Sequence, residues 1–194
     1  SNRLIVVDSA GLDKTIKTSA GATFSHVPFV PGYDGTNKAL YYFGGFVNGG
    51  PLVYTGGDIA RQLGTSVGTV TANSGTDTFT KVAHGLANTT RIFFTNSGGA
   101  LPTGLSEDII YYVINAAADT FQISINSGGA AENFTSNGTG TQTVYRSTQP
   151  LDWLDGFEKP RWGFMHLGRM FVGGNAVRPH GVYVSVLNNH SDFL

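Results

Sequence analysis

Apolar and polar residues alternate along the chain in short runs of about 4–8 residues, separated by Gly, Pro, Asn and Asp. Such alternation places side chains on two opposite faces and predicts half-buried β-strands. One stretch, GDIARQLG at 57–64, has modest helical spacing between glycines. The expected strands are RLIVV (3–7), ATFSHVPFV (22–30), ALYYFG (39–44), PLVYT (51–55), RIFFT (91–95), IIYYVIN (109–115), TFQISI (120–125), WGFMHL (162–167), RMFVG (169–173) and GVYVSVL (181–187). The pattern therefore predicts an all-β protein.

One pattern of strand and glycine occurs twice. LYYFGGFVNGGPLVYT (40–55) aligns with RMFVGGNAVRPHGVYVS (169–185), and the Gly-Gly and Val-Tyr pairs share an offset of 129 residues. Each copy consists of an apolar strand, two glycines, a loop with proline and a Val-Tyr strand. The repeat predicts two related, blade-like antiparallel sheets. The residues that define the motif are Gly44, Gly45, Tyr54, Gly173, Gly174 and Tyr183.

The composition changes near residues 66 and 145. The segment between them is rich in Thr, Ser, Gly and Asn and poor in charge. Without it, the repeat period shortens to about 50 residues, close to the ~40–50 of four-stranded propeller blades. We therefore expect a blade-like host domain, 1–65 with 145–194, interrupted by a small β-barrel or sandwich module at 66–144. The host residues suffice for little more than two blades of a ring of about 4–8, so we expect an incomplete propeller.

Charge and cysteine content narrow the function classes. Charged residues make up 13% of the chain, and the net charge is −1. This composition lacks the basic surface that tight nucleic-acid binding needs. The absence of cysteine from the sequence excludes disulfides, thiolate nucleophiles and Cys-based zinc sites.

The sequence contains no recognised constellation for catalysis, cofactor binding or metal binding. None of the five histidines has the spacing of a metal motif, and neither a nucleophile elbow nor a phosphate loop occurs. We therefore predict that the chain is not an enzyme and has no cofactor, catalytic or metal-binding residues.

Two places are candidate contacts for a partner or a glycan. Trp153 lies among carboxylates that include Asp155, which suits either a sugar cleft or a solvated loop whose aromatic ring is buried. Tyr111 and Tyr112 are neighbours on an expected strand, so one should be buried and the other exposed. The candidate contact residues are Tyr111, Tyr112, Trp153 and Asp155.

Residues 79–143 resemble a small β module of phage virion proteins, which is similar to the FCCH domain (first catalytic cysteine half-domain) of ubiquitin-activating enzymes. The resemblance implies a decorating module on a virion protein and no ubiquitin chemistry, because the chain has no cysteine. The motifs that carry it are AHGLA (83–87), GALPTGL (99–105), YYVINA (111–116), DTFQ (119–122) and GTG (138–140).

Residues 168–194, and partly 40–55, resemble propeller-blade segments of phage nozzle or lower tail-tube proteins. That resemblance implies a non-enzymatic structural component of a bacteriophage tail or neck, forming a ring around the DNA ejection path. Its partners would be other copies and neighbouring tail proteins, with DNA passing unbound. It would be made in the bacterial cytoplasm and reside in the virion. The residues that carry the resemblance are Arg169 to Gly174, Pro179, Val182, Tyr183, Ser185, Asp192 and Phe193.

An alternative function stays open at this point. The chain would then be a receptor- or glycan-binding tail fibre or adhesin protein, in which Trp153 and its neighbouring carboxylates, or the inserted module, meet a host surface glycan or receptor.

Overall fold

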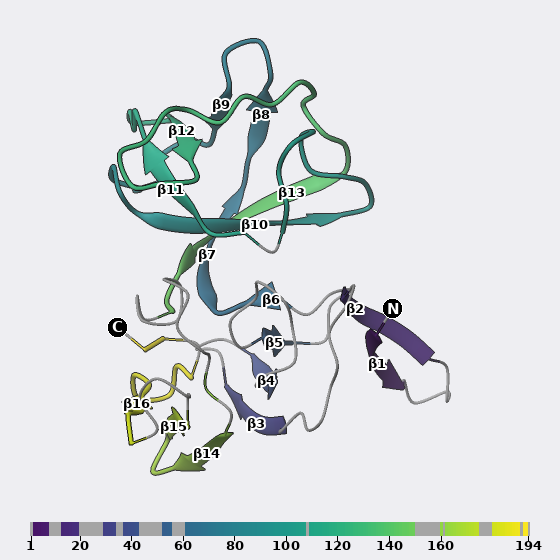
Figure 1. Ribbon diagram of the computed structural model, residues 1–194, viewed down its shortest axis with the longest axis vertical. Helices are drawn as coiled ribbons and strands as arrows, with labels where there is room; N and C mark the ends of the chain where they lie inside the picture. The colour runs from purple at the N-terminus through teal and green to yellow at the C-terminus, as the bar shows by residue number, and fades with distance from the viewer. Residues whose placement is uncertain are drawn as a thin grey trace. The chain divides into compact units, whose positions relative to one another are not determined.

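The computed structural model is all-β over the residues it describes, as the alternation predicted (Figure 1). Every described element is a β-strand, and no described helix is long and apolar enough to cross a membrane. The described residues are 2–7 and 13–19 (backbone alone), 29–33, 37–42, 52–55, 61–107, 109–149, 160, 162–174, 180–190 and 192–193.

The stretch expected to have helical character, 57–64, is described from residue 61 onward. There it forms β6 (Arg61–Gln62) and the start of β7 (Gly64–Thr69). The helical expectation is wrong for these residues, because their backbone hydrogen bonds go to neighbouring strands.

The chain divides into two compact units. The inserted unit comprises Gly64–Ser147, and the host unit comprises Ser1–Leu63 together with Thr148–Leu194. Each unit has its own core of buried apolar side chains. That the inserted unit is an FCCH-like module and the host unit part of a propeller stays a prediction.

The inserted unit is one antiparallel sheet with the order β7-β13-β10-β11-β12-β9-β8. Its edge strands β7 and β8 are separated in sequence by Val70 alone, whose N–H donates to the Gln142 carbonyl at 3.0 Å. The sheet is therefore so strongly curved that its two edge strands are consecutive in the chain and meet at Val70. It does not close into a barrel. The further strands are β8 (Thr71–Asn73), β9 (Thr78–Thr80), β10 (Arg91–Ser97), β11 (Tyr111–Ile114), β12 (Thr120–Ser124) and β13 (Thr141–Ser147).

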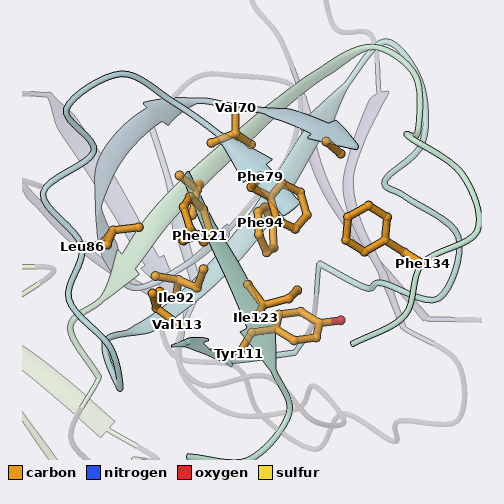
Figure 2. Packing of buried hydrophobic residues seen from close by; sticks show 12 residues of the cluster. Val70, Phe79, Leu86, Ile92, Phe94, Tyr111, Val113, Phe121, Ile123 and Phe134 are labelled. Atoms are coloured by element: carbon orange, nitrogen blue, oxygen red, sulfur yellow. The ribbon is translucent and has the colours of Figure 1, made fainter. Parts of the chain in front are cut away.

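Aromatic rings form the centre of the inserted unit's core (Figure 2). The Phe79 ring centroid lies 4.7 Å from that of Phe94, 5.6 Å from Phe121 and 5.2 Å from Phe134. All four side chains are fully buried. Full burial of a side chain of this size stabilises the folded state by about 1.5–3 kcal/mol. All four rings belong to the inserted unit, so this cluster stabilises the unit from within.

The host unit contains a four-stranded and a three-stranded antiparallel meander. Their orders are β3-β4-β5-β6 and β14-β15-β16. A separate hairpin pairs β1 (Asn2–Val7) with β2 (Asp13–Ser19). The remaining strands are β3 (Phe29–Tyr33), β4 (Lys38–Tyr42), β5 (Leu52–Tyr54), β14 (Trp162–His166), β15 (Arg169–Gly173) and β16 (Val182–Val184).

The two meanders share one core. Both contribute side chains to a single buried cluster: Val30, Ala39, Tyr41, Val53, Leu63, Met170, Val172 and Phe193. Strand alternation places every second residue of β4 and β15 in this cluster, so each meander packs one face against it.

Candidate functional site

The repeated motif forms equivalent positions in the two meanders. β4 and β15 are the second strands and have the same order of exposed, half-buried and buried residues. In the structure, Tyr41 of β4 therefore corresponds to Val172 of β15. The alignment of the two sequences had paired Tyr41 with Met170, which lies two positions earlier. Val53 of β5 faces the core, as does Tyr183 of β16, so the two Val-Tyr pairs differ by one position.

Trp162 explains why β15 ends with Gly173 and a second glycine, Gly174, follows it. A Cβ on Gly173 would lie 2.7 Å from Trp162 Cζ2, and one on Gly174 would lie 2.5 Å from Trp162 Cδ1. Gly174 also has a φ of 80°, which other residues adopt only with strain. The glycines therefore allow the indole to lie directly against the backbone. Of the other motif residues, Tyr54 is half-buried on β5, and Gly44 and Gly45 lie outside the described residues.

His190 joins the two meanders through its buried ring. Its Nδ1 accepts the Tyr33 N–H at 2.7 Å, so its Nε2 carries the proton and donates to the Gly168 carbonyl at 3.0 Å. The His190 N–H donates to the Tyr33 carbonyl at 2.8 Å, and the Tyr41 hydroxyl donates to the same oxygen at 3.1 Å. The imidazole thus ties β3 to the turn between β14 and β15. The sequence contains no local signal for this role, because the partners are far apart in the chain.

The three-stranded meander carries an aromatic row on the side away from the host core. The ring centroids of Trp162 and Phe164 are 6.0 Å apart, and those of Phe164 and Phe171 are 5.2 Å apart, with interplanar angles of 15° and 5°. Val182 and Val184 lie on the same side by strand alternation. We call these five residues the outer face.

The tyrosine pair divides between core and surface. Tyr111 is fully buried, and its hydroxyl accepts the Ser106 N–H at 3.0 Å. Burial raises the pKa of Tyr111; the hydrogen bond from Ser106 lowers it, and the nearby Glu132 charge raises it. Tyr112 is half-buried beside Arg91 and Ser124, so it is the member of the pair with a surface for a partner. Trp153 and Asp155 lie outside the described residues.

Among the described residues, no group of three or more His, Asp or Glu side chains is arranged to hold a metal ion. His84 shows how one histidine is used instead. Its Nδ1 accepts the Leu86 N–H at 3.0 Å, and its Nε2 lies 3.3 Å from the Thr120 carbonyl. This ring fixes a turn through backbone contacts.

Comparisons with known proteins return one distant structural likeness. No protein-family model matches the chain, and no curated protein matches it. A solved structure titled "Phage phi92 endosialidase" matches at 14% identity with a TM-score of 0.26, over 84% of this chain. The matched region spans 37% of that protein.

That likeness corrects one expectation. The sequence predicted a chain that is not an enzyme, whereas the matching structure is named as an endosialidase. The lack of recognised catalytic motifs in the sequence therefore does not exclude catalysis.

Proposed function

We propose that the chain is a structural component of a bacteriophage tail or neck, similar to nozzle or lower tail-tube proteins, assembled as a ring around the path of the DNA. The observation that carries this proposal is the pair of antiparallel meanders that share one core in the host unit. Meanders of this kind are the building units of propeller blades. The resemblance of residues 168–194 to blade segments of tail proteins supports the same assignment.

The inserted unit supports the proposal in a second way. Its motifs resemble a module that decorates phage virion proteins, and its core is built from its own side chains. An insertion of this kind adds surface for contacts with neighbouring subunits. A net charge of −1 suits a DNA conduit, because a strongly basic wall would retain the DNA. The partners would be other copies and adjacent tail proteins, within the virion.

Electron cryo-microscopy of virions tests the proposal. A small gold-binding tag in the exposed turn between β8 and β9, at Gly75, would mark the chain, with untagged virions as the control. We expect label in a ring on the tail axis. Label at the tip of a peripheral fibre would overturn the proposal and favour a receptor- or glycan-binding protein.

Deletion of the gene separates the same two functions by phenotype. A tail or neck component should leave particles with incomplete tails or prematurely released DNA. A receptor-binding protein should leave complete particles that keep their DNA and fail to adsorb.

A further inference from the structure

Exposed apolar side chains gather on the outer face of the β14-β15-β16 sheet. Phe164 is 50% exposed, Val182 53% and Val184 41%, on the side opposite the core residues Met170 and Val172. The end of the sheet adds further exposed apolar residues: Leu167, Val186 and Leu187. A contiguous apolar patch of this kind marks an interaction site on a folded protein.

The size of the patch suits a protein partner. With Trp162, these seven side chains expose roughly 600 Å² of surface, compared with the ~800 Å² that each partner buries in a standard interface. The polar residues at the rim of the sheet supply the remaining area. A partner that covers the patch therefore reaches the size of a stable protein interface.

We propose that the outer face binds the same face of a second copy of this chain, around a two-fold axis that lies between the two faces, runs across the strands and passes beside Phe171. Phe171 is the middle residue of the middle strand, opposite Phe164 on one side and Val184 on the other. The other meander offers no equivalent free surface at its centre, because Tyr42 and Leu52, which point away from the host core, are 2% and 0% exposed. The exposed aromatic residues of that meander, Phe29 and Tyr33, lie on its first strand, β3. The outer face on β14-β16 is thus the broader of the two apolar surfaces and is the one that we expect to pair with itself.

The positions of the charged and aromatic residues favour this two-fold arrangement. Arg169 pairs with His166 at one end of the sheet, and Trp162 pairs with Gly173 at the other. A two-fold axis that runs across the strands brings the end of the sheet with Arg169 over the end with Trp162 of the second copy. The Arg169 guanidinium, whose Nη1 donates to the Ser185 carbonyl at 2.9 Å, then lies near that indole, which attracts a cation. An axis across the strands also keeps the two Arg169 side chains at opposite ends, whereas an axis along the strands would place them together.

This contact goes beyond the proposed function and does not depend on it. A two-fold contact closes at a dimer, so any ring must use another surface. The dimer is measured on the purified chain, whereas the proposed function is measured on virions. Failure of either proposal therefore leaves the other standing.

Light scattering of the purified full chain tests the dimer with a matched pair of variants. We expect twice the chain mass of 20.5 kDa for the wild type. Val182→Glu places two carboxylates in the interface and should raise the dissociation constant about tenfold or more. Val82→Glu makes the same change at a residue that is 74% exposed in the inserted unit, and it should remain dimeric. A monomeric wild type at high micromolar concentration, or equal masses for the two variants, would overturn the proposal.

Leu167→Asn provides a variant that should fold at least as well as the wild type. Leu167 is 82% exposed with a φ of 46°, a conformation that asparagine tolerates better than leucine. We expect this variant to keep its melting temperature and to dimerise several-fold more weakly. Unchanged dimerisation at full stability would contradict the proposed extent of the interface.

Cross-linking tests the position of the axis. The sequence has no cysteine, so Phe171→Cys introduces a unique thiol at the proposed centre. A short bis-maleimide should join two Phe171→Cys chains and should not join two Val82→Cys chains. Dimers that form without a Phe171→Cys cross-link would refute the two-fold arrangement.

Discussion

His190→Ala should selectively destabilise the host unit. The imidazole is 5% exposed and bridges the Tyr33 N–H and the Gly168 carbonyl. Alanine leaves both backbone groups without these partners and removes the ring that packs near Tyr41, with centroids 6.4 Å apart. The link between β3 and the β14–β15 turn is then reduced to backbone contacts.

The magnitude follows from two different losses. The Tyr33 N–H loses its bond to the His190 ring, whereas the Gly168 carbonyl loses one bond and still accepts the Asn188 N–H at 2.8 Å. An unsatisfied buried donor costs about 1–3 kcal/mol, and a lost hydrogen bond whose acceptor keeps another partner costs about 1 kcal/mol, so the free energy of unfolding falls by about 3 kcal/mol. That is a large share of the ~5–15 kcal/mol by which a domain is stable. Since about 1.4 kcal/mol corresponds to a factor of ten, the opening equilibrium of the host unit should rise about 100-fold.

Amide hydrogen exchange, followed by mass spectrometry, measures each unit separately, which a single melting temperature would not. Peptides that contain Met170 and Val172 should exchange about 100-fold faster in His190→Ala, and peptides that contain Val113 should not change. His84→Ala should show the reverse, because His84 makes the analogous backbone contacts inside the inserted unit. His180→Ala, at an exposed position, is the matched control and should leave both units unchanged.

Equal acceleration in both units for His190→Ala would refute the reasoning, because it would mean that the ring does not act within the host unit. An unchanged host unit would also refute it, because the two hydrogen bonds would then contribute nothing to stability.

Three further predictions concern single side chains. Phe79→Ala should lower the free energy of unfolding of the inserted unit by about 3–5 kcal/mol in a urea titration, because the site is fully buried among rings. Gly174→Ala should lower the stability of the host unit by about 2 kcal/mol or more, from backbone strain and the clash with Trp162; Gly85→Ala, with a φ of 64° and nothing within 4 Å, shows the strain alone. Tyr111→Phe should remove a loss of stability at high pH. Because the folded-state pKa of Tyr111 is raised, wild-type stability is complete below the ordinary pKa of 10.0 and falls as pH rises above it, as a urea titration at several pH values would measure.

The fold class was predictable because strand alternation is a local property. β14 and β15 follow the alternation of WGFMHL and RMFVG, and burial follows the same alternation. The sequence alone did not predict which residues of the two repeat copies occupy equivalent positions in the two meanders. Val53 and Tyr183 both face the core although they occupy different places in the Val-Tyr pair. Twelve positions separate Tyr41 from Val53, whereas eleven separate Val172 from Tyr183, so matching letters do not occupy matching places in the two sheets.

The cross-sheet role of His190 was beyond local reasoning for another reason. Its partner Tyr33 is 157 residues away in the chain, and a single histidine followed by Ser and Asp has no distinctive spacing. The exposure of the Phe164 side chain could not be predicted from the sequence either. Alternation predicts that two faces exist, but only packing decides which one another sheet covers.

The ends of the inserted unit have a consequence for how such proteins change over time. Gly64 and Ser147 are direct partners in neighbouring strands, so the chain enters and leaves this unit at one place. In the host, the Thr148 N–H donates to the Leu63 carbonyl at 3.3 Å, which closes the host chain across the same point. The host backbone therefore needs no adjustment to accommodate the inserted unit. Recombination can exchange the inserted unit for another module, or delete it, and leave the remaining strand pairs of the host unit intact.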